Sequence, residues 1–229
     1  MRAVVLAGGQ GTRLRSVIDD VPKPMAPVNG RPFLAHLLDR LERQGIDRVV
    51  LSVGFRKEAI MAAFGNRYRG VAIEYAVETE PLGTGGGLRQ ALALVGGFPA
   101  FGLNGDTILE LDYRAMLRAH EAAKPPLTIA LRRVPDAARY GRAKVEDGRL
   151  VGFAARGEGE GPGLINGGVY LFAENVLADP SLPASFSFER DFLEARAATL
   201  KPLAFETDGY FIDIGVPDDY ARAQRELAS

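Results

Sequence analysis

Residues 3–14 read AVVLAGGQGTRL, an apolar run that leads without interruption into three glycines and an arginine. Five consecutive apolar residues, Ala3 to Ala7, are typical of a strand that is buried on both faces of a sheet. Glycines directly after such a strand let backbone N–H groups approach a polyphosphate, because no Cβ stands in the way. Arg13 adds a permanent positive charge whose planar fork suits phosphate oxygens. The segment therefore predicts a strand followed by a phosphate-binding turn.

Two common nucleotide motifs do not fit this loop. A Walker loop needs Gly-Lys-Ser or Gly-Lys-Thr, and here Gly11 is followed by Thr12 and Arg13. The glycine spacing also fails the G-x-G-x-x-G pattern, which argues against a dinucleotide-dependent oxidoreductase. The glycines alone would favour a plain strand-to-helix turn. Arg13 and the segments that follow it favour a ligand-binding loop.

Beyond the loop, strands and helices alternate through the first half of the chain. The strands are expected at residues 48–53, 71–77 and 101–104, and the helices at 33–41, 57–64 and 88–94. This alternation predicts a parallel sheet covered on both faces. In the second half, strands are expected at 127–134, 143–146, 150–154 and 164–172, and helices at 188–200 and 218–227. Asp147-Gly148 is a strong hairpin signal, so we expect antiparallel strands added to an α/β core.

The amino-acid composition argues against several classes of binding partner. The formal net charge is −1, so no global field would attract nucleic acid or acidic lipid. The chain has no cysteine, which excludes disulfides and thiolate metal sites. The N-terminal apolar run is too short for a signal sequence, and no later stretch approaches a membrane span. We expect a cytoplasmic protein with neither nucleic-acid nor membrane partners; the sequence predicts no oligomeric state.

Three further segments carry candidate chemistry. Pro22 and Pro24 hold Lys23 in an extended backbone just after the phosphate loop, where its charge can act on a phosphate. The alternative is a proline-stiffened surface loop with a solvated lysine. Residues 78–87 and 104–106 each follow an expected strand, as the first loop does. Ligands of open α/β sheets bind at the carboxyl ends of strands, so these segments predict one active site.

Taken together, these segments resemble the sugar-phosphate nucleotidyltransferase family. The matching segments, in the family's order, are GGQGTRL (8–14), PKPM (22–25), EPLGTGG (80–86), NGD (104–106), NGGVY (166–170) and DIGVPDDY (213–220). The resemblance spans nearly the whole chain and implies a Rossmann-like three-layer α/β/α sandwich with a mixed, mainly parallel sheet and added antiparallel strands. It also implies a single domain over residues 1–229, with a nucleotide-binding half at about 1–110 and a sugar-phosphate-binding half at about 111–229.

The resemblance assigns roles to particular residues. Arg13 and Lys23 resemble the family's triphosphate-contacting and catalytic pair, and Asp106 and Asp213 its two magnesium-binding carboxylates. Each aspartate taken alone would be read as a turn former. The implied cofactor is Mg²⁺, and the implied substrates are a nucleoside triphosphate and a sugar 1-phosphate. The expected nucleotide-binding residues are Leu6, Gly8, Gly9, Gly11, Thr12, Arg13, Lys23, Glu78, Pro81, Gly83, Thr84 and Gly105.

The implied reaction is in-line attack by the sugar-phosphate oxygen on the α-phosphorus, with release of pyrophosphate. The nucleophile is already anionic at neutral pH, so no general base is needed. Catalysis would then rest on positioning and on neutralisation of developing charge. The two histidines, His36 and His120, lie in helical segments away from the motifs and are interpreted as structural.

Base choice is inferred from Glu78, five residues before Gly83. Thymidylyl- and uridylyltransferases of the family often carry glutamine at this place. A carboxylate offers only acceptors, which suits the adjacent N1–H and N2–H₂ donors of guanine. Glu78 therefore favours GTP, with a solvated loop glutamate as an equal alternative.

The sugar-phosphate site is expected at Gly141, Lys144, Arg156, Asn166 and Gly167. Many relatives carry Glu-Lys-Pro near residues 155–157, and here Arg156 takes the place of the lysine while the acid and the proline are absent. Residues 13–34 and 186–193 look most like D-glycero-α-D-manno-heptose 1-phosphate guanylyltransferases. The alternatives are mannose-1-phosphate guanylyltransferases and N-acetylmuramate- or hexose-1-phosphate uridylyltransferases. A catalytically silent nucleotide-sugar-sensing subunit is a different class, which the intact charged residues disfavour.

Overall fold

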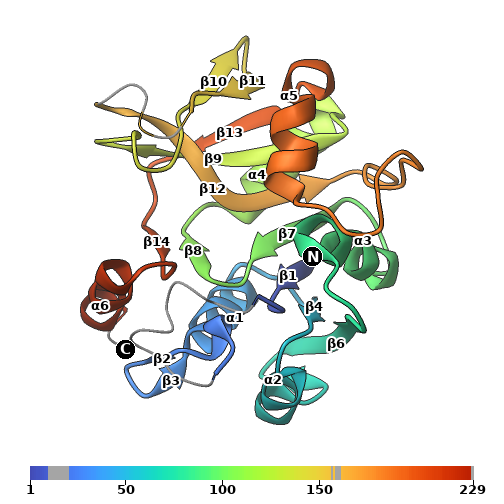
Figure 1. Cartoon of the computed structure of the whole chain (residues 1–229), viewed down its shortest axis with the longest axis vertical. Coiled ribbons are helices and arrows are strands. Elements are labelled where there is room, and N and C mark those ends of the chain that lie inside the picture. Colours follow the sequence, from blue (N-terminus) through green and yellow to red (C-terminus); the bar gives the residue numbers. More distant parts are fainter. Residues whose placement is uncertain (10–20, 156, 158–160, 228–229) are drawn as a thin grey trace.

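The computed structural model describes residues 1–9, 21–155, 157 and 161–227 (Figure 1). Within these residues the largest sheet has ten strands. In spatial order they are β10 (Ala143–Glu146), β11 (Arg149–Phe153), β13 (Leu203–Thr207), β9 (Leu127–Val134), β12 (Gly163–Phe172), β7 (Ala100–Asn104), β1 (Arg2–Leu6), β4 (Arg48–Val53), β6 (Val71–Val77) and β5 (Arg67–Tyr68). Strands β5, β11 and β12 run opposite to the others. The expected mixed, mainly parallel sheet is confirmed.

Helices cover both faces of this sheet. They are α1 (Phe33–Arg43), α2 (Lys57–Phe64), α3 (Gly83–Leu94), α4 (Tyr113–Ala123), α5 (Ala195–Leu200) and α6 (Pro217–Glu226). Successive side chains of a strand point to opposite faces, so Val5 packs in one buried cluster with Leu34 of α1. Its neighbour Val4 packs in a second cluster with Leu88 of α3. Residues of α1, α2, α4 and α6 belong to the first cluster and residues of α3 and α5 to the second, which makes a three-layer sandwich.

Strand β12 joins the two halves of the chain. It pairs with β7 from the first half and with β9 from the second, so one sheet runs through both. Two small two-stranded sheets lie outside this large sheet. In one, β8 (Thr107–Leu109) pairs antiparallel with β14 (Phe211–Asp213), and in the other β2 (Pro27–Val28) pairs antiparallel with β3 (Arg31–Pro32). In the part of the chain that is described, no helix has the length and apolarity needed to cross a bilayer.

Two predicted helices differ from the structure. We expected a helix from Leu88, but α3 begins at Gly83 and includes the glycines that we had placed in a loop. Residues 188–200 do not form one regular helix, because Phe188–Glu194 is a π-helical segment (η3) that leads into α5. Both differences occur where α3 and η3 meet.

The glycines of α3 allow the segment before η3 to approach the helix backbone. A Cβ on Gly86 would lie 2.5 Å from the carbonyl oxygen of Ala184. At this close approach the N–H of Gly85 donates to the carbonyl of Phe186 at 2.8 Å, and the N–H of Phe188 donates to Oγ1 of Thr84 at 2.9 Å. Glycine has no Cβ, so it is the residue that permits such backbone contact. The glycine run therefore has a packing role beside any role toward phosphate.

Replacing Gly86 with alanine is expected to destabilise the protein. Alanine raises helix propensity by about 1 kcal/mol, but overpacking against a backbone carbonyl costs about 1–3 kcal/mol. We expect a net loss of about 1 kcal/mol in the free energy of unfolding, measured by urea denaturation. Gly152→Ala is the control, since a Cβ there meets nothing within 4 Å. If the Gly86→Ala protein were as stable as the wild type, the backbone at Ala184 would be able to move away from the added methyl group at little cost in free energy.

Candidate active site

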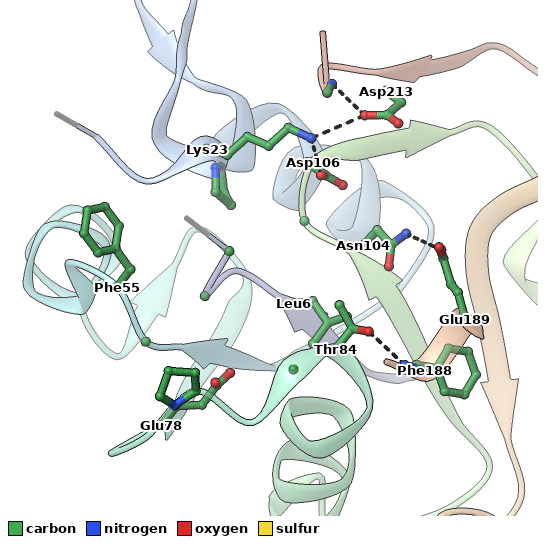
Figure 2. Close-up of a pocket in the computed structure, with 18 of the residues that line it drawn as sticks. Leu6, Lys23, Phe55, Glu78, Thr84, Asn104, Asp106, Phe188, Glu189 and Asp213 are labelled. Atoms are coloured by element: carbon green, nitrogen blue, oxygen red, sulfur yellow. Dashed lines mark hydrogen bonds and ion pairs between the residues drawn. The ribbon is translucent and has the colours of Figure 1, made fainter. Parts of the chain in front are cut away.

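The carboxyl ends of β1, β4, β6 and β7 surround a cavity of about 880 Å³ (Figure 2). Residues predicted to bind nucleotide line it from four separate segments of the chain. They are Leu6, Gly8, Gly9, Lys23, Glu78, Pro81, Gly83, Thr84 and Gly105. The structure thus brings these residues together at one edge of the sheet. Gly11, Thr12 and Arg13 lie outside the described residues.

Asp106 and Asp213 meet because of the β8–β14 pairing. Asp213 is the register partner of Thr107, which places it beside Asp106. Gly105 directly before Asp106 comes close to β1, where its N–H donates to the carbonyl of Leu6 at 2.9 Å. A Cβ at position 105 would collide with that carbonyl oxygen. Glycine is therefore required for the chain to turn here and direct Asp106 into the cavity.

Lys23 lies between the two carboxylates. Its Nζ donates to Oδ2 of Asp106 and lies 3.5 Å from Oδ1 of Asp213 (Figure 2). The lysine side chain is only 10% exposed. The N–H of Gly215 donates to the same Oδ1 of Asp213 at 2.7 Å. Lys23 is therefore not a solvated lysine on a surface loop, because its ammonium group contacts two carboxylates.

The electrostatics of the pair favour a shared cation. Burial raises the pKa of Asp213, and the negative charge of Asp106 raises it further, while Lys23 opposes both effects. Two carboxylates facing one positive charge also suit a divalent cation, since Mg²⁺ is commonly held by one or two carboxylates with phosphate oxygens and waters as further ligands. Among the described residues, no group of three or more His, Cys, Asp or Glu gathers as a metal site. Two adjacent carboxylates are sufficient protein ligands for a Mg²⁺ site that a phosphate-bearing substrate completes.

Glu78 lies at the opposite end of the cavity from the aspartates (Figure 2). Its Oε1 accepts a hydrogen bond from the hydroxyl of Ser52 at 3.0 Å, and its Oε2 accepts one from the N–H of Leu82 at 3.1 Å. A purely solvated glutamate is therefore not what the structure shows. Each carboxylate oxygen has a second lone pair, so the group keeps acceptor capacity toward a ligand.

A second cavity of about 530 Å³ adjoins the first. The residues that line both are Asn104, Tyr140, Glu189 and Asp213. Of the predicted sugar-phosphate residues, Gly141 and Asn166 line the second cavity. Lys144 and Gly167 are absent from the walls of both cavities: Lys144 is exposed on β10, and Gly167 is buried against Leu109 and Ala130. Arg156 lies outside the described residues.

Arg139 and Glu189 line the cavities but were not among the predicted site residues. Arg139 lines the first cavity and bonds to the buried carboxylate of Asp219 in α6. Arg222 also donates to Asp219, at 3.1 Å, and to the carbonyl of Phe211 in β14 at 2.8 Å. This network ties α6 to the strand that carries Asp213. The sequence signal for Arg139 was its position two residues before Gly141, which was expected at the sugar-phosphate site.

Glu189 was not predicted either. It belongs to η3, within the 186–193 segment that the family resemblance had singled out. Its Oε1 lies 3.4 Å from the amide nitrogens of Asn104 and Asn166 and from the hydroxyl of Tyr170. A π-helical segment does not follow the 3.6-residue period, so helical periodicity could not show which of its side chains faces the cavity.

The two histidines lie away from both cavities, as expected. Nε2 of His36 is 2.9 Å from the carbonyl oxygen of Val28. Nδ1 of His120 is 2.7 Å from the hydroxyl of Thr128. Both rings are buried and bonded within the protein, which agrees with a structural role.

Comparisons with known proteins agree with this geometry. Residues 2–229 match the family described as nucleotidyl transferase. The chain is 45% identical to the D-glycero-alpha-D-manno-heptose 1-phosphate guanylyltransferase of Aneurinibacillus thermoaerophilus, over 99% of this chain and 98% of that protein. It is 42% identical to the enzyme of the same name from Campylobacter jejuni, over 96% of this chain and 97% of that protein.

A solved structure shows the same likeness in three dimensions. The crystal structure of HddC from Yersinia pseudotuberculosis complexed with GMP-PN superposes with a TM-score of 0.87 and 36% sequence identity. The match covers 100% of both chains. The resemblance inferred from the motifs is confirmed in both sequence and fold. The chain belongs to the nucleotidyl transferase family, whose members are enzymes that transfer a nucleotidyl group.

Proposed function

We propose that this enzyme joins GTP to D-glycero-α-D-manno-heptose 1-phosphate, releasing pyrophosphate and forming the GDP-sugar. The observation that carries the proposal is the pair of adjoining cavities, which share Asp213 as a lining residue. Two phosphate-bearing substrates in these cavities would bring their phosphates together at Asp106 and Asp213. The full-length likeness to two heptose 1-phosphate guanylyltransferases supports both the base and the sugar.

The chemistry needs no general base from the protein. The ionised oxygen of the sugar phosphate forms a bond to the α-phosphorus, and the bond from that phosphorus to the oxygen bridging to the β-phosphate breaks. Pyrophosphate leaves with the electron pair. Lys23 and Arg13 neutralise charge that develops on the phosphate oxygens, and the first cavity holds the two reacting groups in line. Asp106 and Asp213 would hold Mg²⁺, which supplies further charge neutralisation at phosphate oxygens when bound.

The remaining assignments follow from the same proposal. Backbone N–H groups at Gly8, Gly9, Gly11 and Thr12 bind the triphosphate. Gly141 and Asn166 bind the sugar, and Arg156 its phosphate. Residues 1–229 act as one domain, because β12 continues the sheet from one half into the other. The use of a nucleoside triphosphate is consistent with a cytoplasmic enzyme.

A substrate matrix tests the proposal. GTP, ATP, UTP and dTTP are each combined with heptose, mannose and N-acetylmuramate 1-phosphates, and pyrophosphate release is measured without any added partner protein. We expect the highest kcat/KM for GTP with the heptose 1-phosphate. Equal use of mannose 1-phosphate would correct the sugar alone, whereas no pyrophosphate from any pair would favour the silent sensing subunit.

Glu78 is proposed to read the base by accepting from N1–H and N2–H₂ of guanine. Inosine triphosphate lacks the 2-amino group, so the kcat/KM ratio of GTP to ITP isolates one of the two bonds. A charge-assisted hydrogen bond contributes about 1.5–3 kcal/mol, which corresponds to a ratio of roughly 10- to 100-fold. Glu78→Gln should reduce this ratio, because an amide has one acceptor oxygen and no charge.

The contacts of Glu78 supply the control for this variant. Its carboxylate also accepts from Ser52 and Leu82, so Glu78→Gln is expected to weaken the start of α3 as well. Ser52→Ala removes one of these internal bonds and keeps the carboxylate. It should therefore leave the GTP-to-ITP ratio unchanged. An unchanged ratio in Glu78→Gln itself would exclude Glu78 as the base-reading residue.

A further inference from the structure

The second cavity combines small apolar side chains with a few fixed polar groups. Gly152, Ala154 and Ala155 line part of it, and a Cβ on Gly152 would meet nothing within 4 Å. The carboxylates among its described lining residues belong to Asp213, Glu189 and Glu194. Asp213 is engaged by the ammonium of Lys23 and the N–H of Gly215. The remaining carboxylates that could contact a neutral ligand in this cavity are those of Glu189 and Glu194.

Glu189, like Asp213, lies at the junction of the two cavities. It lines both of them and extends from η3 toward Asn104 of β7 (Figure 2). The amides of Asn104 and Asn166 and the hydroxyl of Tyr170 all approach its Oε1. Tyr170 is almost completely buried, and burial together with the nearby Glu189 raises its pKa well above the usual value. Its hydroxyl therefore keeps its proton and remains a donor.

A bulge in β12 orients one of these donors. The pairing of β12 with β9 shifts register between Asn166 and Tyr170, and Gly168 within the shift has a φ of +71°. Bulges of this kind re-aim side chains at functional sites. Oδ1 of Asn166 accepts from the N–H of Gly168 at 3.0 Å, so its Nδ2 is turned toward Tyr170 and Glu189. Asn104, Asn166 and Tyr170 thus direct neutral donors at the carboxylate of Glu189.

We propose that Glu189 is the residue that recognises the hydroxyl groups of the sugar, acting as a specificity-determining acceptor in the second cavity. The proposal rests on the proposed function, which supplies the sugar 1-phosphate as substrate. An ionised carboxylate is acceptor-only, and hydroxyl groups of a sugar are hydrogen-bond donors, so the two are chemically complementary. Hydrogen bonds to a charged acceptor are stronger than those between neutral groups. A sugar that lacks the recognised hydroxyl group would therefore bind more weakly.

The first test separates binding of the two substrates. Glu189→Gln keeps the shape of the side chain and one acceptor oxygen, so the fold is expected to persist, as judged by Tm. KM for the sugar 1-phosphate should rise roughly 10- to 100-fold, while KM for GTP stays within a factor of about two. The control is Glu174→Gln, an exposed glutamate that lines neither cavity, with no expected change in either KM.

A second test identifies the hydroxyl. Sugar 1-phosphates that each lack one hydroxyl are assayed with the wild type and with Glu189→Gln. The deoxy compound that loses the recognised hydroxyl should lower kcat/KM in the wild type but cause little further loss in the variant, because one interaction cannot be removed twice. Strictly additive losses for every deoxy compound would overturn the proposal, as would an equal rise of both KM values.

The two proposals fail in different ways. Wild-type protein that releases no pyrophosphate with any sugar 1-phosphate overturns the proposed function. An active wild type whose sugar KM is unaffected by Glu189→Gln overturns the role of Glu189 and leaves the proposed function intact. Glu189→Asp adds a further check, since it keeps the charge on a shorter side chain and should restore part of the sugar affinity that the amide loses.

Discussion

Asp106→Asn and Asp213→Asn are each expected to lower kcat by about 10³-fold or more at saturating substrates. The amide that replaces either carboxylate carries no charge, so it holds a divalent cation poorly. It also leaves the partly buried ammonium of Lys23 with one counter-charge in place of two. Initial rates of pyrophosphate release with Mg²⁺ in excess give the measurement. A chelator should abolish the activity of the wild type, and added Mg²⁺ should restore it.

A matched control for these substitutions is Asp208→Asn. Asp208 is largely exposed and pairs with Arg132 at 3.6 Å, outside the walls of both cavities. We expect its kcat to equal that of the wild type. If Asp106→Asn or Asp213→Asn retained turnover within a few-fold, the pair would not bind the catalytic cation. Turnover that persists in the chelator would refute the metal requirement itself.

Lys23→Met is expected to lower kcat by about 10²- to 10³-fold while raising affinity for divalent cations in the nucleotide-free protein. The loss follows because a charge that stabilises the reacting phosphates is removed. The gain follows because the ammonium lies between the two carboxylates that we propose as ligands of the cation, so the two positive groups would compete for one place. The same side chain thus opposes the cation before the substrate arrives and assists the reaction afterwards.

Binding of Mn²⁺, followed by its electron paramagnetic resonance signal, measures the second effect without any turnover. Lys124→Met is the control, because Lys124 is exposed at the end of α4. Tighter Mn²⁺ binding only in Lys23→Met would support the competition. Weaker binding in that variant would mean that Lys23 helps to shape the carboxylate pair, and an effect confined to KM would assign Lys23 to ground-state binding.

Much of the central fold could be predicted from sequence because its signals are local. The apolar run at β1 and the glycines after it specify a buried strand and a turn within a few residues. The short β8 and β14 strands could not be found this way, since three residues carry no usable periodicity. The start of α3 was also missed, because glycine usually indicates a loop, whereas here it allows close contact with the segment before η3.

Site residues with a local sequence signal could also be predicted, whereas those set by tertiary packing could not. Residues at strand ends, such as Glu78 and Asp106, could be placed because the ends of parallel strands converge. Lys144 and Gly167 were chosen from segment resemblance, which does not determine the face on which a side chain lies. The bond of Glu78 to Ser52, and those of Glu189 to its three donors, join segments far apart in sequence. Such contacts depend on tertiary packing and have no local signature.

The pairing of β8 with β14 also has a consequence for the order of folding. Asp106 and Asp213 are separated by about a hundred residues, and closing so long a loop costs about 4 kcal/mol of chain entropy plus a constant. Two three-residue strands cannot offset that cost alone. The carboxylates therefore meet only after the large sheet has brought both halves of the chain together. The cation that we propose between them would bind the native state and not the unfolded chain, so it would stabilise the completed fold by mass action.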